Sequence, residues 1–394
     1  MHLAFHKRAI TIVAAATAIL MLAPAIAVSG GGHHHHQART VSAVEYVGEV
    51  VIPTGTVYEG TEIGGLSSIT YDRGRDVYYV LSDDQGNRST GDPVRYYTAA
   101  INTSDGSLDD GDVEFADVTT IYERHKTPFA PGGLDPEGLV LASGGQLYMS
   151  SEGNALANPP IDPFINRYNL NGRVTARLPI PDKYIPNGVD RGVRFNLGFE
   201  SLNLTPGGRQ LVTAGEAALF QDGPAPSFLN GSLARVLVYD IHKKLPQAEY
   251  VYEVDPWAEP STIFGVNGIV EVLPIDNVGT MLVMERSFSV GGVLGGGTGN
   301  VVTIYETSTD GATDVLGEDA LYVGGSPISF TPMTKRVVFS FDDLGIPIDN
   351  IEGMTFGPTL PDGRQSLVVV SDNNFGAGQF TQFIVLALDI DSVG

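Results

Sequence analysis

One line of sequence recurs five times along the chain, and this repeat limits the possible folds more than any other feature. The copies read "GGLSSITYD" (64–72), "PEGLVLASG" (136–144), "FESLNLTPG" (199–207), "VNGIVEVLP" (266–274) and "IEGMTFGPT" (351–359). A turn follows each copy, and then a second apolar stretch that ends in an acid, as in "YVLSDD" (79–84). Because similarity at a regular spacing is typical of repeat architectures, we expect one structural unit built five times.

Each unit has the composition of β-strands. A third β-rich stretch follows a variable loop in every unit, and a fourth is visible in some, such as "AEYVYEV" (248–254). Val, Ile, Tyr and Thr dominate these stretches, and none keeps a helical period. Four strands a unit predict an all-β fold, a β-propeller with five visible blades. A two-domain β-sandwich is the alternative, but it would not place acids at matching positions in successive units.

Two features concern the closure and the size of the ring. The last unit ends after its third strand, near Leu388, whereas a spare strand, "VEYVGEVVI" (44–52), precedes the first unit. We therefore expect this N-terminal strand to complete the last blade and close the ring. The longest step, between Asn267 and Glu352, also contains "EDALYVG" and "RVVFSFDD", so it has room for a sixth blade.

The N-terminus has the pattern of a signal peptide over residues 1–27. Lys7 and Arg8 precede a short apolar run, and Ala25-Ile26-Ala27 has the small-x-small form of a cleavage site. The run is short for a bilayer span, although an uncleaved N-terminal anchor is the alternative. We expect a secreted or periplasmic protein without stable membrane insertion after cleavage.

The remaining chain divides into a linker and one domain. Residues 28–43, which include a run of four histidines, are predicted to be a disordered linker, and 44–394 a single propeller domain. The chain has 46 acids against 23 lysines and arginines, a net charge of −23, so nucleic acid is not an expected partner. It contains no cysteine, which excludes disulfides and thiolate sites. We expect a monomer.

The repeat places acids at matching positions. In a propeller the first strand of each blade lines the central channel, so acids at its start should form one ring there, and those that end the second strand form another candidate ring. Crowded carboxylates need a counterion, and oxygen ligands suit Ca2+ or another divalent ion. Alternatively, each acid binds backbone amides or arginines. The predicted metal ligands are Asp83, Asp84, Glu137, Glu152, Glu200, Glu216, Asn267, Glu285, Glu352 and Asp372.

Arginines lie beside the same stretches in a chain that has few bases. Their guanidinium groups could hold a small anionic substrate such as a phosphoester, or they could pair with neighbouring carboxylates. The predicted anion-binding residues are Arg95, Arg167, Arg235 and Arg286. No G-x-S-x-G or H-E-x-x-H motif is present, so the catalytic residues stay unknown at this stage.

In motif order, the chain resembles the bacterial phytase-like proteins with esterase-like activity. The resemblance rests on "GGLSSITYDRGRDVYYVLSDDQGNRSTGDPVRYYTAAI", "DPEGLVL", "FNLGFESLNLTPGGRQLVTAGEAAL" and "DNIEGMTFGPTLPDGRQSLVVVSDNNF", and it extends over about residues 44–390. It implies a β-propeller that hydrolyses ester or phosphoester bonds, and calcium-dependent propeller phytases are the suggested analogy. It carries over the positions of Asp83, Asp84, Glu137, Glu152, Glu200, Glu352 and Asp372, without their roles.

These observations support three hypotheses about function. The first is an exported calcium-dependent phosphoester hydrolase whose substrate binds at the channel face. The second is a non-catalytic propeller, stabilised by calcium, that binds a ligand or partner at the cell envelope. The third is a lactonase-like hydrolase. Turnover of a panel of esters with and without a chelator separates the second hypothesis from the others.

Overall fold

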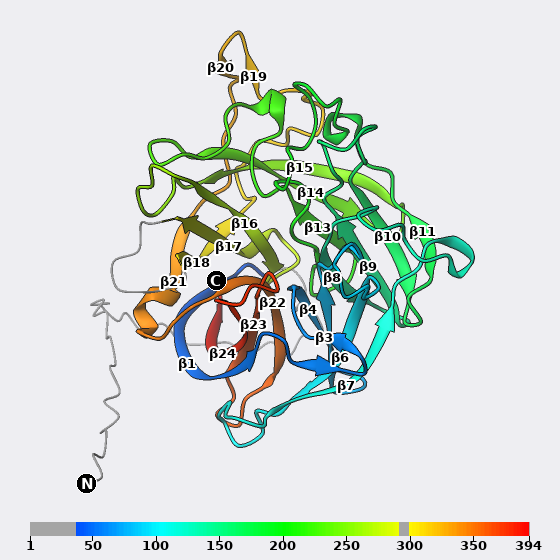
Figure 1. Ribbon diagram of the computed structural model, residues 1–394. Coiled ribbons are helices and arrows are strands. Elements are labelled where there is room, and N and C mark those ends of the chain that lie inside the picture. The colour runs from blue at the N-terminus through cyan, green and yellow to red at the C-terminus, as the bar shows by residue number, and fades with distance from the viewer. Residues whose placement is uncertain (1–36, 291–298, 394) are drawn as a thin grey trace, which may run out of the picture. The chain divides into compact units, whose positions relative to one another are not determined.

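The computed structural model describes residues 37–290 and 299–393 and has an all-β fold. Within these residues, five four-stranded antiparallel sheets form the blades of a β-propeller. The innermost strands of the blades, β4, β8, β12, β16 and β22, contact one another in sequence, and β22 returns to contact β4. Figure 1 shows the sheets arranged around these strands. The predicted five-bladed propeller is therefore confirmed.

The strands of each blade run outward from the channel. Blade 1 contains β4 (Leu66–Asp72), β5 (Val77–Ser82), β6 (Arg95–Ile101) and β7 (Val113–Thr120). Blade 2 contains β8 (Pro136–Ala142), β9 (Gln146–Ser151), β10 (Phe164–Asn169) and β11 (Val174–Arg177). Blade 3 contains β12 (Asn203–Leu204), β13 (Gln210–Ala214), β14 (Ser232–Asp240) and β15 (Leu245–Val254). Blade 4 contains β16 (Gly265–Pro274), β17 (Thr280–Ser289), β18 (Asn300–Ser308) and β21 (Arg336–Ser340). Blade 5 contains β22 (Asn350–Thr359), β23 (Gln365–Asp372), β24 (Phe380–Ser392) and β1 (Arg39–Pro53).

The N-terminal strand closes the ring, as the sequence predicts. β1 pairs antiparallel with β24 from Arg39↔Ser392 to Pro53↔Phe380, and Figure 1 shows the blue β1 beside the red β24. The strand begins at Arg39, before the predicted domain boundary at residue 44. The signal peptide at 1–27 and most of the predicted linker lie outside the described residues. Among the described helices, none is long and apolar enough to cross a bilayer.

The long step before the fifth repeat contains an insertion in blade 4 and no sixth sheet within the described residues. It lies between β18 and β21 and includes a small hairpin, β19 (Tyr322–Val323) with β20 (Ser326–Pro327). Val315 and Leu321 of the insertion pack against Val251 of β15, on the outer edge of blade 3. A second small hairpin, β2 (Val57–Tyr58) with β3 (Thr61–Glu62), leads into blade 1. The short 3-10 helices are η1 (Arg124–Lys126), η2 (Asp182–Tyr184), η3 (Phe220–Asp222) and η4 (Phe341–Leu344).

The main apolar core consists of five clusters, each between two neighbouring blades. Successive side chains of one strand enter different clusters: Tyr78 and Val80 pack toward blade 5, whereas Tyr79 and Leu81 pack toward blade 2. A strand buried on both faces reads as a continuous apolar run, which is why these strands do not alternate in sequence. The ring is thus held by apolar contacts between blades, without disulfides.

Candidate functional site

The acids of the repeat meet at one end of the channel because of an irregularity in strand pairing. Near the start of the first strand, the pairing with the second strand is interrupted by a β-bulge in blades 1, 2, 4 and 5. A bulge adds a residue to one strand and changes the direction of its side chain. In blade 5 the extra residue is Glu352, between the pairs Ile351↔Ser371 and Gly353↔Val370. In blade 2, Glu137 lies in the corresponding interruption.

The second strand supplies the matching set of side chains. In each blade, the residue just before the bulge pairs with a residue of the second strand. The residue that follows this partner lies at the channel. Blade 3 keeps this relation through the bridge Phe199↔Gly215, which places Glu200 and Glu216 at the two positions. The residues at the bulge position are Ser67, Glu137, Glu200, Val270 and Glu352. The residues that follow the paired residue of the second strand are Asp83, Glu152, Glu216, Arg286 and Asp372.

Eight carboxyl groups and one guanidinium group form this site, which we call the acidic ring. The carboxyl groups belong to Asp83, Asp135, Glu137, Glu152, Glu200, Glu216, Glu352 and Asp372. All but Asp83 have at most 9% of their surface exposed. The guanidinium group is that of Arg286, whose Nη2 lies 3.3 Å from Glu352 Oε1 and 3.6 Å from Glu216 Oε1. The ring therefore has far more negative than positive groups.

Burial and mutual repulsion raise the pKa values of these acids. Burial is the largest cause for Glu152, whose pKa rises to about 8, with Asp135 and Glu216 adding repulsion. The pKa of Glu352 also rises to about 8, through burial and then the charge of Asp372. Burial raises the pKa of Asp135 and of Asp372 to about 6. Without a counterion, several of these groups hold protons near neutral pH.

Glu200 is at the centre of the crowding. Its pKa lies well above the ordinary value because it is buried and because Glu152, Glu137 and Glu216 repel its charged form. Glu200 offers an oxygen within 4.8 Å of one from Glu152, and two buried acids this close favour a shared proton when no cation is bound. A cation that both acids bind would replace that proton.

The donor set fits a divalent metal ion. The groups Asp135–Glu137–Glu152 and Glu152–Glu200–Glu216 each offer carboxylate oxygens within 4.8 Å of one another. Two oxygens that bind one Ca2+ at about 2.4 Å are separated by no more than about 4.8 Å. Among the described residues, Glu152 Oε2 and both carboxylate oxygens of Glu216 are buried without a hydrogen-bond partner. Oxygens in this condition are suited to ligate a hard cation, and Glu152 is common to both groups.

Local backbone features accompany the ring. Gly268 lies under Glu216, and a Cβ at this position would be only 2.1 Å from Glu216 Cγ. After Asp372, the non-glycine residues Asn374 and Phe375 have left-handed φ values of 45° and 51°. The guanidinium of Arg88 lies 3.3 Å from the centroid of the Phe375 ring. Strained backbone beside a polar cluster is typical of functional sites.

Three predicted metal ligands lie elsewhere. The predicted ligand Glu285 accepts hydrogen bonds from Tyr252, Lys335 and Asn267. Asn267 itself also donates to the carbonyl oxygen of Asp255. Both residues therefore take part in a charge cluster of blade 4 that does not include the acidic ring. Asp84 accepts a hydrogen bond from Arg95 at 2.9 Å.

Of the predicted anion-binding arginines, Arg286 lies in the ring and the other three are engaged elsewhere. Arg95 is buried and donates to Asp84 and Tyr97. Arg235 is buried against Asp222 and Glu249. The Nε atom of Arg167 donates to Thr175 on β11. Asp135 is a ring member that the sequence predictions did not include, although it stands in the quoted stretch "DPEGL".

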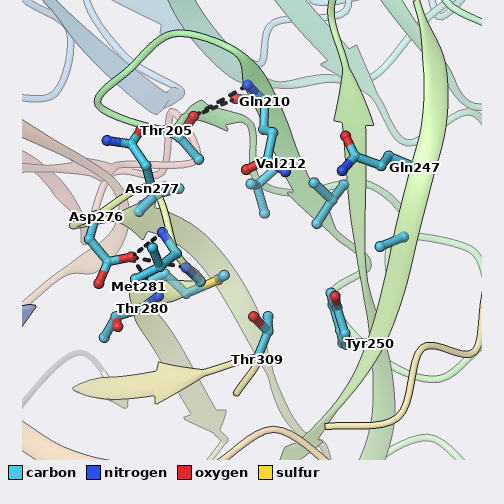
Figure 2. Close-up of a pocket in the computed structure, with 15 residues that line it drawn as sticks. Thr205, Gln210, Val212, Gln247, Tyr250, Asp276, Asn277, Thr280, Met281 and Thr309 are labelled. Atoms are coloured by element: carbon cyan, nitrogen blue, oxygen red, sulfur yellow. Dashed lines mark hydrogen bonds between the residues drawn. The ribbon is translucent and has the colours of Figure 1, made fainter. Parts of the chain in front are cut away.

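A separate cavity of about 140 Å3 lies at the opposite ends of the strands, between blades 3 and 4 (Figure 2). Thr205, Gln210, Gln247 and Tyr250 are among its lining residues. Its carboxylate, Asp276, accepts hydrogen bonds from the backbone amides of residues 278, 279 and 280. Because this acid is satisfied by the backbone, the cavity lacks the uncompensated groups that distinguish the acidic ring.

The fold and the ring define a β-propeller with an acidic channel mouth that fits a divalent cation. A family model described as "Phytase-like: Esterase-like activity of phytase" matches residues 61–375. The chain belongs to this phytase-like family, as the sequence motifs indicate.

One curated relative is an uncharacterized secreted protein of Arthroderma benhamiae (strain ATCC MYA-4681 / CBS 112371). It is 26% identical over 191 residues, a match that covers 40% of this chain and 35% of the relative. The chain thus spans about a third of the length of the relative that it matches.

Solved propellers are similar in part. An endo-arabinase of Bacteroides thetaiotaomicron has 12% identity and a TM-score of 0.43, with 89% of this chain and 99% of that chain covered. A periplasmic gluconolactonase of Pseudomonas aeruginosa has 12% identity and a TM-score of 0.33, with 85% and 90% covered. These similarities are too distant to carry an argument about activity.

Proposed function

We propose that this protein is an exported calcium-dependent hydrolase of ester bonds, including phosphoesters, that acts at the acidic ring. The observation that supports the proposal most is the set of buried carboxylate oxygens of Glu152, Glu200 and Glu216 that lie within reach of one ion. Membership of the phytase-like family, described by its esterase-like activity, agrees with it. Export is supported by the N-terminal residue pattern and by the secreted relative.

Residues of the ring have distinct roles in this proposal. Glu152, Glu200 and Glu216 would hold the ion, with Asp135 and Glu137 completing a second group around Glu152. Bound calcium would supply charge neutralisation and a more acidic coordinated water. Arg286, the ring's only cation among the described residues, would bind an anionic oxygen of the substrate.

Glu352 is the residue best suited to move a proton. Asn350 donates to its Oε1 at 2.8 Å and Arg286 at 3.3 Å, so the carboxyl group is oriented from two sides. Its pKa is about 8 in the ring without an ion, raised by burial and by Asp372, and a bound cation would lower it toward neutral. A group with a pKa near the working pH exchanges protons efficiently with a reacting oxygen.

The test is hydrolysis of a panel of carboxylic esters, phosphomonoesters and lactones by the full chain, with calcium or with EGTA. We expect turnover of at least one ester class that EGTA abolishes and added calcium restores. Absence of turnover for every substrate, together with a calcium-dependent rise in melting temperature, would support the non-catalytic, ligand-binding propeller instead. Turnover of lactones alone would favour the lactonase-like hydrolase.

A further inference from the structure

The first two strands of blade 4 extend beyond the acidic ring. β16 and β17 pair at Gly268↔Arg286, the level of the ring, and continue for three more pairs to Gly265↔Ser289. Ile263 and Phe264 immediately precede β16. At about 3.3 Å per residue, Phe264 is about 13 Å from Gly268 along the strand. By comparison, β8 begins at Pro136, beside the ring. Blade 4 therefore forms a wall at one side of the channel mouth.

The top of this wall is apolar and exposed. We call it the apolar rim and define it by Phe228, Leu229, Trp257, Ile263 and Phe264. The exposed fractions are 81% for Leu229, 76% for Ile263, 54% for Phe264 and 43% for Phe228. Several large apolar side chains exposed on two linked loops mark a binding surface more often than single exposed residues do.

Trp257 joins the two loops that form the rim. Its backbone amide donates to the carbonyl oxygen of Ser227 at 3.1 Å, and its indole Nε1 donates to that of Pro226 at 3.0 Å. Its ring also packs over Gly265, where a Cβ would lie only 2.4 Å away. The rim is thus fixed to the start of β16 and, through β16, to the ring.

The charge around the rim restricts what it can bind. The rim loops at 224–231 and 255–265 contain no lysine or arginine, and Lys335, which reaches Asp255 of the second loop, is paired with that acid and with Glu285. The ring beside them has eight carboxyl groups and one arginine. An anionic lipid surface or a molecule with many phosphates would be repelled by this arrangement. An uncharged hydrocarbon group would pack against the apolar side chains and would need no lysine or arginine from the rim loops to bind it.

We propose that the apolar rim binds the hydrocarbon part of the substrate, while its ester group reaches the acidic ring. The inference rests on the proposed function and specifies its substrate class: esters with one apolar arm of several carbons. The chain runs from Phe264 at the rim directly into β16 and along it to Gly268 under Glu216, and this connects the two parts of the site.

Trp257 provides a direct measurement because it is the only tryptophan in the chain. The probes are N-methylbutanamide and N-methyloctanamide, which have the shape of esters and resist hydrolysis. We expect the longer amide to change the Trp257 emission and to bind about tenfold or more tightly than the shorter one, because burying methylene groups favours binding. Phe264→Ser should remove this difference. Leu245→Ser, at an exposed apolar position where β15 begins at the opposite end of the blades, is the matched control and should keep it.

These measurements test binding at the apolar rim separately from the proposed hydrolase activity. Equal affinities for the two amides, or a chain-length preference that survives Phe264→Ser, would overturn the apolar rim as a binding site. A wild-type dimer that Phe264→Ser converts to a monomer in sedimentation velocity would show that a second copy covers the rim, and would also overturn it. Amide binding with no turnover of any ester would leave the rim supported and the hydrolase proposal refuted.

Discussion

Arg286 of blade 4 donates to Glu352 of blade 5, with Nη2 3.3 Å from Oε1. Arg286 occupies the position at which the other four blades have an acid, so blade 4 contributes a positive group where the repeat predicts a negative one. Burial alone would lower the pKa of Arg286, but Glu352, Glu216 and Glu200 together raise it. The arginine therefore keeps its charge inside the ring and reduces the number of positive charges that a bound ion must supply.

Replacing this arginine should make the ring depend more on calcium. In Arg286→Met, Glu216 and Glu352 lose their cation, and removing one partner of a buried ion pair costs about 3–5 kcal/mol. We expect a large fall in the melting temperature in EGTA and a calcium-induced rise greater than in the wild type. Arg364→Gln, which breaks only exposed pairs with Glu45 and Asp362, is the control and should change stability little. Equal calcium-induced rises in Arg286→Met and the wild type would contradict the expectation.

Acids of the ring should contribute to calcium affinity, whereas acids that belong to the repeat but lie outside the ring should not. Glu200→Gln removes a negative oxygen ligand and should weaken calcium binding about tenfold or more, measured by calorimetry. Glu285→Gln is the matched control because Glu285 is equally buried but pairs with Lys335 and Tyr252. It should lower stability and leave calcium affinity unchanged. The proposed ion site would be wrong if the two variants had the same affinity.

The pH dependence of stability should differ between the metal-free and the calcium-bound protein. Glu152 and Glu352 have pKa values of about 8 in the folded chain, against an ordinary value of 4.5. Because folding raises these pKa values, the folded state binds more protons, and the metal-free protein loses stability as the pH rises from about 4.5 to about 8. We expect the melting temperature in EGTA to be higher at pH 5 than at pH 8. Saturating calcium should bind better at pH 8, where the ligands are ionised, and should reduce or reverse the difference.

Arg235 is a buried arginine outside the ring, and its replacement should affect the stability of the fold but not calcium binding. It donates to Asp222 and Glu249, and Glu249 also accepts a hydrogen bond from Lys183. Arg235→Gln leaves these acids short of a cation and should destabilise the fold by about 3–5 kcal/mol in urea unfolding. Calcium affinity of the folded fraction should stay unchanged, since no ring carboxylate contacts Arg235. A calcium affinity that changes clearly in Arg235→Gln would contradict this separation.

The sequence was sufficient to predict the fold because the propeller is a repeat. Every blade needs the same apolar strands and turns, and these recur visibly even where single residues differ, as in "PEGLVLASG" and "IEGMTFGPT". The closing strand was predictable for a related reason. The last unit has only three strands and a spare strand precedes the first unit, so the spare strand can complete the last blade. The sequence alone did not exclude a sixth blade, because an insertion of short β-like segments resembles a blade in sequence.

The members of the ring were harder to predict because they depend on register. Aligning the glycine of "VNGIVEVLP" with that of "PEGLVLASG" makes Asn267 the counterpart of Glu137. Strand pairing instead places Val270 at the bulge and Arg286 opposite Gly268, at the position that holds an acid in the other blades. A slip in register redirects every side chain that follows, and the sequence does not show where a bulge falls. Asp135 escaped prediction because the other blades have Gly65, Gly198, Gly268 and Asn350 at the corresponding position.

The closing strand offers a last prediction with an internal control. Val50 and Val51 are neighbours on β1, but Val50 is 6% exposed and belongs to the core cluster between blades 5 and 1, whereas Val51 is 44% exposed. Because side chains alternate along a strand, Val50→Asp puts an unpaired charge into the core and Val51→Asp puts one into solvent. We expect Val50→Asp to destabilise the protein by about 3 kcal/mol or more and Val51→Asp by no more than about 0.5 kcal/mol, measured by urea unfolding. Equal effects would mean that β1 does not pack as the fourth strand of blade 5, and the ring would then be closed in another way.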